Sequence, residues 1–117
     1  MVEKHEVKQY LEELELKISI FGILFRDDRG KNQQALASLE IAPGQRKEII
    51  KNLSPEDYVQ GPLEEKMHGM LDMWVFGKSM RGSEVYIKVS LGTENNEAVC
   101  ISFHVADHPL SYPFKKQ

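Results

Sequence analysis

Two stretches of the C-terminal half, SEVYIKVSL (residues 83–91) and AVCISFHVA (residues 98–106), alternate apolar and polar side chains. The apolar positions are Val85, Ile87 and Val89 in the first stretch and Val99, Ile101, Phe103 and Val105 in the second. A period of two is typical of a strand with one buried face. A third run extends from Leu71 to Ser79, so the region from Leu71 to Phe114 is predicted to form three β-strands.

The polar loop from Gly92 to Asn96 can join the last two strands as an antiparallel pair. A symmetric register around this loop predicts the facing pairs Ile87 with Ile101, Tyr86 with Ser102, and Lys88 with Cys100. One face of the sheet would then carry a phenol, an ammonium, a hydroxyl and, from His104, an imidazole. This polar face is the main indication of function in the sequence.

The turn at Met80-Arg81-Gly82 admits two lengths, which place the preceding strand differently. A two-residue turn puts Trp74 and Phe76 on the apolar face, whereas a three-residue turn puts them on the face of Tyr86. We favour the two-residue turn because it gathers the aromatic and branched side chains into one core.

The N-terminal half is predicted to be helical, and the apolar spacing from Glu3 to Leu16 indicates an amphipathic helix. The segment from Lys17 to Phe25 is compatible with a strand or with a continued helix. Further expected elements are a helix from Gln33 to Leu39, a helix from Pro43 to Leu53 with Arg46, Lys47 and Lys51 outward, a short turn capped by Ser54, and a loop over residues 61–70. The prediction is a single α+β domain, residues 1–117, with N-terminal helices packed on a C-terminal antiparallel sheet.

Composition limits the classes of function. The chain has 117 residues, one cysteine and a formal net charge of −3. An acidic balance argues against a broad electrostatic grip on nucleic acid but leaves room for a local phosphate site; short basic runs, such as that around Lys31, are expected to be solvated. No apolar run is long enough to span a bilayer, so we expect no membrane partner and a cytoplasmic location. Cys100, inside an apolar strand, is expected to be a packed thiol.

The polar face has the side chains that RNA cleavage through the 2′-hydroxyl requires. That reaction needs a base, cations that neutralise the phosphorane, and an acid for the 5′-oxygen, and it needs no metal. Tyr86, Lys88 and His104, with Lys78 near the hairpin end, provide these groups. The plainer interpretation is an ordinary solvated strand face.

A metal site is the competing chemical interpretation. His104, Asp107 and His108 have a spacing that would converge on an ion only in a helix. Pro109 and the preceding strand argue against a helix there, so we expect neither a metal nor another cofactor.

The motifs LSPEDYVQGPL (residues 53–63), MWVFGK (73–78), EVYIKVSL (84–91) and VCISFH (99–104), with HPLSYPF (108–114), resemble the MqsR family of bacterial toxins. The resemblance is strongest from about Leu53 onward. It implies a RelE-like fold and a metal-independent endoribonuclease of a type II toxin–antitoxin system, with mRNA as substrate and a cognate antitoxin as protein partner. It places Tyr86 at the catalytic tyrosine position, matches Lys88 to a family lysine, and implies that Gln60, Lys88 and Ser102 contact RNA.

The chain departs from the family pattern at three positions. Gln60 and His104 stand where lysines are expected, and Val75 stands where a glutamine follows the tryptophan. An imidazole can still exchange protons near neutral pH, and Lys78 is expected to supply the missing cation. Two rival functions stay open, namely a non-catalytic interaction domain with the toxin fold and a small-molecule-binding domain that uses the loop around His68 and Met70.

Overall fold

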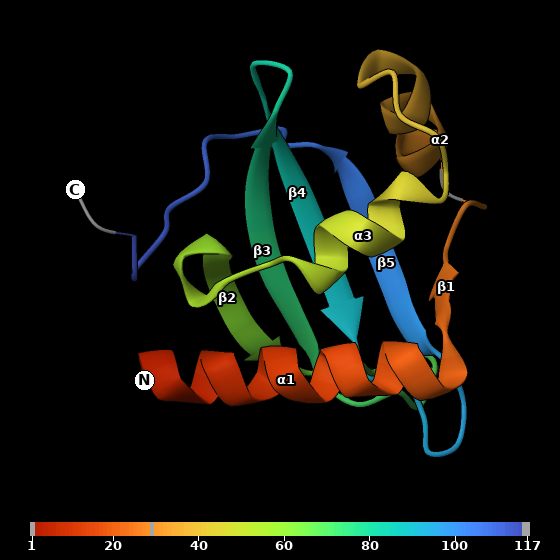
Figure 1. Ribbon diagram of the computed structural model, residues 1–117, viewed down its shortest axis with the longest axis vertical. Coiled ribbons are helices and arrows are strands. Elements are labelled where there is room, and N and C mark those ends of the chain that lie inside the picture. Colours follow the sequence, from red (N-terminus) through yellow and green to blue (C-terminus); the bar gives the residue numbers. More distant parts are fainter. Residues whose placement is uncertain (1, 29, 116–117) are drawn as a thin grey trace.

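The computed structural model describes residues 2–28 and 30–115 as an α+β fold whose helices precede most of the sheet (Figure 1). The helices are α1 (Lys4–Phe21), α2 (Gly30–Ser38), α3 (Gln45–Lys51) and the short 3-10 helix η1 (Pro55–Asp57). The strands are β1 (Ile23–Phe25), β2 (Tyr58–Leu63), β3 (Met73–Met80), β4 (Ser83–Ser90) and β5 (Ala98–Val105). The predicted fold class is therefore confirmed.

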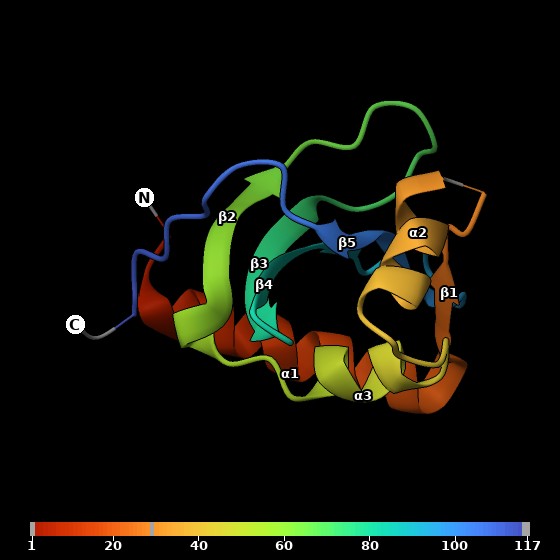
Figure 2. The same ribbon diagram turned by 90° about the horizontal axis from the view of Figure 1, so that it is seen from above.

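The five strands form one mixed sheet in the order β1-β5-β4-β3-β2. The pairs β3–β4 and β4–β5 are antiparallel, as the sequence predicted, whereas β2 adds a further antiparallel strand beside β3 and β1 adds a parallel strand beside β5. Helices α1 and α3 lie on one side of the sheet, and the segment after β5 crosses the other side (Figure 2). No helix within residues 2–28 and 30–115 is long and apolar enough to span a membrane.

Helix α1 packs through one stripe, because Val7, Tyr10, Leu14 and Ile18 recur every three or four residues and all are buried. The segment from residue 17 to 25 contains both of the structures that the sequence allowed, the end of a helix and a short strand. The helix continues to Phe21, Gly22 ends it with a φ of 85°, and β1 follows directly. The end of α1 therefore lies beside the edge of the sheet.

Helix α3 corrects one prediction. Arg46 was expected in solvent, but its side chain is only 3% exposed. Its Nη1 and Nη2 atoms donate to the two carboxylate oxygens of Asp27 at 2.7 and 3.0 Å, and the guanidinium lies 4.0 Å from the centroid of the Phe25 ring. A bidentate carboxylate and an aromatic face replace water around the cation, which makes its burial tolerable.

The β3–β4 hairpin has the two-residue turn that the sequence favoured. Met80 pairs with Ser83, and Arg81 and Gly82 both have positive φ, at 48° and 78°. Trp74 and Phe76 therefore lie on the helix side of the sheet. Trp74 is half-buried there and stacks on Tyr10 with ring centroids 4.4 Å apart.

Two expectations about the remaining strands are wrong. Residues 58–63 form edge strand β2 rather than a turn and the start of a loop, with irregular pairing and a cis bond before Pro62. Proline lacks an N–H, which an edge strand tolerates.

The predicted register of β4 and β5 is also wrong, because Ile87 pairs with Phe103 and not with Ile101. Val89 pairs with Cys100 while Lys88 pairs with Ser102, so Ile101 is an extra residue in β5, a β-bulge. The bulge reverses the alternation, and Cys100 belongs to the core against the helices instead of the polar face.

Candidate functional site

The corrected register brings the polar side chains of β4 and β5 into direct opposition. Tyr86 faces His104, and Lys88 faces Ser102. The rings of Tyr86 and His104 stack with centroids 5.3 Å apart and an interplanar angle of 16°. The Lys88 ammonium lies 6.0 Å from the centroid of the Tyr86 ring. Three of the four predicted catalytic residues therefore share one small area of the sheet.

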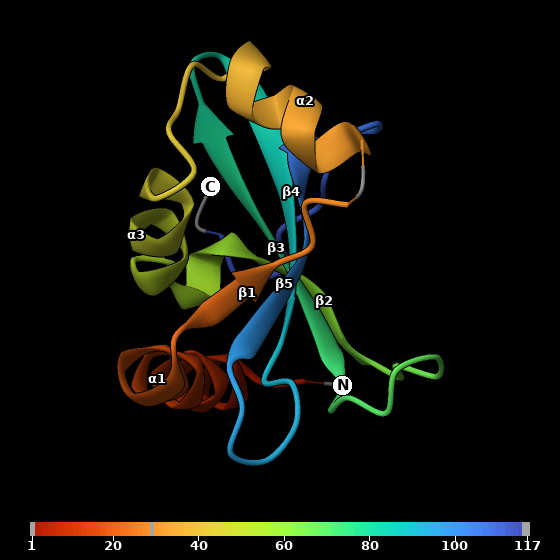
Figure 3. The ribbon, with the colours of Figure 1, turned by 90° about the vertical axis from the view of Figure 1, so that its right-hand side faces the viewer.

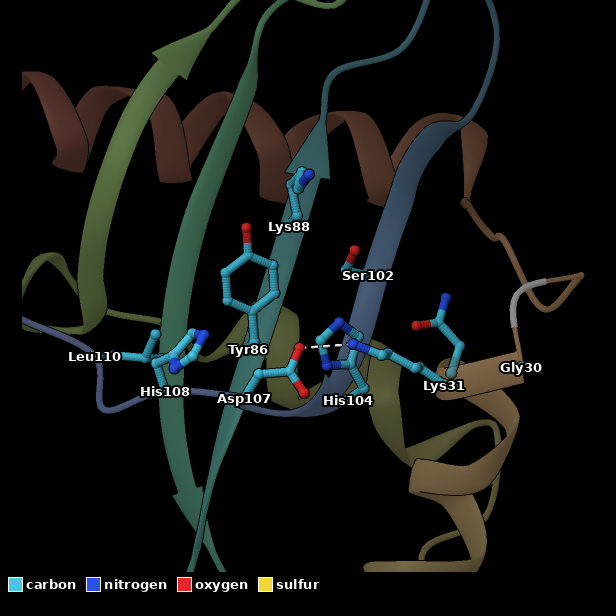
Figure 4. A pocket seen from close by; sticks show the side chains of 10 residues that line it. Gly30, Lys31, Tyr86, Lys88, Ser102, His104, Asp107, His108 and Leu110 are labelled. Carbon is cyan, nitrogen blue, oxygen red and sulfur yellow. Dashed lines mark hydrogen bonds and ion pairs between the residues drawn. The ribbon is translucent and has the colours of Figure 1, made fainter.

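These side chains form the floor of an open cavity of about 510 Å³ (Figure 4). One wall comes from the start of α2 and includes Lys31 and Asn32. The opposite wall comes from the segment after β5 and includes His108 and Leu110. The cavity is large enough for a nucleotide-sized group, and rigid strands hold its floor.

The imidazole of His104 has one ring nitrogen committed to the backbone. Its Nδ1 atom lies 2.9 Å from the carbonyl oxygen of Val105. A carbonyl only accepts hydrogen bonds, so Nδ1 carries a proton and donates it. In the neutral ring Nε2 then has a lone pair, which suits it to accept a proton from a substrate hydroxyl.

An ion pair closes the rim of the cavity between α2 and the segment after β5. The Lys31 ammonium lies 2.6 Å from the Asp107 carboxylate, and both side chains are more than half exposed. The hydrogen bond from Lys31 holds the pKa of Asp107 below its ordinary value. An ion pair this exposed contributes little stability, so a bound anion can compete for Lys31.

Ammonium groups outnumber carboxylates around the cavity. Lys31 and Lys88 line it together with the imidazoles of His104 and His108, against the single carboxylate of Asp107. This excess is local, because the chain as a whole carries a net charge of −3. The arrangement favours a small phosphate-bearing ligand over a long electrostatic track.

Asn32 fixes the position of α2 over β5 and is only 2% exposed. Its Nδ2 atom donates to the carbonyl oxygens of Arg26 at 2.9 Å and Ile101 at 3.1 Å, and its Oδ1 atom accepts from the N–H of Phe103 at 3.0 Å. In β5 the side chain thus bonds to the backbone of the bulge residue Ile101 and to that of Phe103, two residues further on. Sequence reasoning missed this role, because the partners of Asn32 in β5 lie 69 and 71 residues away in the chain.

The second wall of the cavity is held by Glu84. Its carboxylate accepts from the backbone N–H of Leu110 at 2.9 Å and from the Tyr112 hydroxyl at 2.7 Å. The chain crosses β3 at Gly77, where any side chain would collide with Leu110 and Tyr112. These contacts fix the segment that carries Asp107 and His108.

Two of the predicted site residues lie elsewhere. Lys78 faces the helix side, opposite Val85, and its ammonium lies 3.3 Å from the Asp57 carboxylate. Gln60 is exposed on β2 and does not line the cavity. Ser102 lines the floor of the cavity, as expected. Lys31 also lines the cavity and provides there the additional cation that was expected from Lys78.

The loop proposed as a small-molecule site is organised by its own carboxylate. Glu65 accepts from the backbone N–H of His68 and Met70, and its carboxylate lies 2.9 Å from Nδ1 of His68. The contact with the His68 side chain lowers the pKa of Glu65 to about 2. Met70 borders a separate cavity of about 310 Å³ together with Tyr10 and Trp74.

Among the described residues, neither the potential metal ligands nor Cys100 is arranged for metal binding or nucleophilic catalysis. No group of three potential metal ligands converges within residues 2–28 and 30–115, and the Asp107 carboxylate already contacts Lys31. Cys100 is buried, and burial raises the pKa of its thiol to about 12, which opposes the formation of a thiolate nucleophile.

Comparisons with models of known families, with curated proteins and with solved structures find no match to this chain. The resemblance to the MqsR family therefore rests on the motifs in the sequence, and function has to be argued from the site.

Proposed function

We propose that this chain is a metal-independent endoribonuclease of the MqsR type, the toxin of a type II toxin–antitoxin system. It would cleave mRNA in the cytoplasm and be neutralised by a cognate antitoxin. Two kinds of support exist. The motifs around Tyr86 and Lys88 resemble that family, and the same residues share a cavity with His104 and Lys31.

The observation that carries the proposal is the direct pairing of Tyr86 with His104 beside Lys88. A phenol and an imidazole in contact supply an acid and a base, and an adjacent ammonium supplies positive charge. Cleavage through the 2′-hydroxyl needs these three functions and no other.

In this mechanism His104 is the general base. Its Nε2 atom takes the proton of the 2′-hydroxyl as that oxygen attacks the phosphorus. Lys88 and Lys31 neutralise the charge that grows on the phosphorane oxygens, and Lys31 can do so because its contact with Asp107 is exposed. The Tyr86 hydroxyl donates a proton to the departing 5′-oxygen, which leaves a 2′,3′-cyclic phosphate and a 5′-hydroxyl end.

The assignment changes how the departures from the family pattern are understood. His104 replaces the final lysine of the family as an acid–base group. The cation that we expected from Lys78 comes instead from Lys31, on a helix that the motifs do not include. Gln60 carries no charge and does not line the cavity.

Induced expression in a bacterial host tests the proposal without knowledge of the RNA sequence that is cut. We expect growth arrest, relieved when the gene adjacent to that of this chain is expressed together with it. His104→Ala and Tyr86→Phe should each abolish arrest, whereas Lys78→Ala, a matched control on the other side of the sheet, should retain it.

Normal growth with well-expressed wild-type protein would contradict the toxin assignment and favour the non-catalytic interaction domain. Arrest that persists in both site variants would keep a toxic protein but remove this cavity from the mechanism.

A further inference from the structure

A second surface, at the other end of the sheet, has no role in the proposed reaction. It lies between the second half of α1 and the loop that joins β4 to β5 (Figure 3). The groove there has a volume of about 620 Å³ and shares no lining residue with the candidate site.

The groove is lined by large apolar side chains that the fold leaves in solvent. Leu16, Ile20 and Leu71 are 62%, 63% and 56% exposed, and Phe21 is 40% exposed. Leu16 and Ile20 are one turn apart on α1, outside the stripe that packs on the sheet, so they form a ridge of their own. Contiguous apolar surface of a few hundred Å² on a monomer commonly marks an interaction site.

The shape of this surface suits a helix. The groove runs along α1 from Glu13 to Phe21, which is about 12 Å or two helical turns at 1.5 Å per residue. It is open along its length rather than enclosed. An amphipathic helix with two apolar residues one turn apart fits such a groove.

We propose that the occupant is a second copy of this chain, related by a two-fold axis. The surface carries a groove and, beside it, an apolar ridge on a helix, so each copy can place its Leu16–Ile20 ridge in the groove of the other. An isologous contact requires this kind of self-complementary surface. The two α1 helices then run antiparallel.

The charges on the groove agree with self-association. Glu13 and Lys17 lie one turn apart on α1 and both line the groove. When two α1 helices run antiparallel, Glu13 of one copy approaches Lys17 of the other, twice over. Lys17 at present donates to the carbonyl oxygen of Thr93 at 2.6 Å, a surface contact that an ion pair can replace. Nucleic acid is disfavoured, because Glu13 and Glu94 both line the groove.

The composition of the surface also agrees with a protein interface. Such interfaces have an apolar centre and a polar, solvent-accessible rim. The exposed side chains of Leu16, Ile20, Phe21 and Leu71 provide the apolar centre, and Thr93, Glu94 and Asn95 provide the polar rim. Both candidate sites of the dimer stay open, because the two cavities lie apart.

Sedimentation velocity of the purified protein, over a concentration series, tests the dimer. We expect wild-type protein to pass from monomer to dimer as concentration rises. Leu16→Glu or Ile20→Glu should raise the dissociation constant about 100-fold or more, since each change removes an apolar side chain from the contact twice and adds two charges. Both residues are exposed in the monomer, so the variants should keep the wild-type circular dichroism spectrum.

Ser19→Glu is the matched control. It adds the same charge to the same helix, at an exposed position that does not line the groove. The control should dimerise like wild type. A wild-type protein that stays monomeric at the highest concentration, or a dimer that persists in both groove variants, would overturn the proposal.

Discussion

Replacement of Asn32 by alanine should destabilise the protein more than most polar substitutions. The side chain is buried and makes three hydrogen bonds, to Arg26, Ile101 and Phe103. Each such bond contributes about 1 kcal/mol net, so Asn32→Ala should lower the free energy of unfolding by about 3 kcal/mol. That is a large part of the stability of a domain this size.

Thermal and denaturant unfolding of the variant measure the effect. For a domain of this length we expect a fall in Tm of about 12 °C, at roughly 4 °C per kcal/mol. Gln33→Ala is the control, because Gln33 is the neighbouring amide and makes one exposed hydrogen bond, at 2.6 Å to the carbonyl oxygen of Asp27. It should cost less than about 1 kcal/mol. Equal, small losses in both variants would refute the role of Asn32 in holding α2 on the bulge of β5.

Three other substitutions test separate parts of the structure. Trp74→Ala should lower the free energy of unfolding by about 3 kcal/mol, because Trp74 stacks on Tyr10 at the helix–sheet boundary; a melt within a few degrees of wild type would contradict this. Asp27→Asn should destabilise the protein at pH 7 but progressively less below pH 4. The hydrogen bond from Arg46 lowers the pKa of Asp27, so the ion pair stabilises the fold fully above the ordinary carboxyl pKa, and this stabilisation is lost as the pH falls through the lowered pKa. A difference in denaturant midpoint between wild type and variant that stays constant with pH would contradict this. Lys31→Ala should slow RNA cleavage in a cleavage assay, whereas Lys78→Ala should not. The reverse result would show that Lys78, and not Lys31, neutralises the phosphorane.

The parts of the fold that depend on local chemistry could be predicted from the sequence. The period of two in β4 and β5 gave the strands, and the Arg81-Gly82 turn gave the faces of Trp74 and Phe76. The segment from Lys17 to Phe25 was left open between a strand and a continued helix, and it contains the end of α1 and strand β1, with Gly22 between them. In each case the residues that decide the structure are neighbours in the chain.

The errors have long-range causes. The carbonyl oxygen of the bulge residue Ile101 accepts a hydrogen bond from Asn32, which is 69 residues away in the chain, and the residues next to Ile101 do not indicate a bulge. Arg46 was assigned to solvent by helical periodicity, because its partner Asp27 belongs to another element.

The same limit applies to the candidate site. Tyr86, Lys88, Ser102 and His104 could be found because they alternate along two paired strands. Lys31 could not, since only the packing of α2 against β5 brings it to the cavity. Lys78 was included because it is close to the site along the hairpin, but strand alternation directs it to the opposite side.

Cleavage of RNA by the purified protein is the most direct test of the proposed function. A long single-stranded RNA is incubated with the protein in the presence of a chelator, and the ends of the fragments are analysed. We expect cutting that survives the chelator, that leaves 2′,3′-cyclic phosphate ends, and that falls by about 10²–10⁴ in rate in His104→Ala. Undiminished cutting in His104→Ala, or cutting that the chelator abolishes and a divalent ion restores, would contradict the metal-independent mechanism built on Tyr86 and His104.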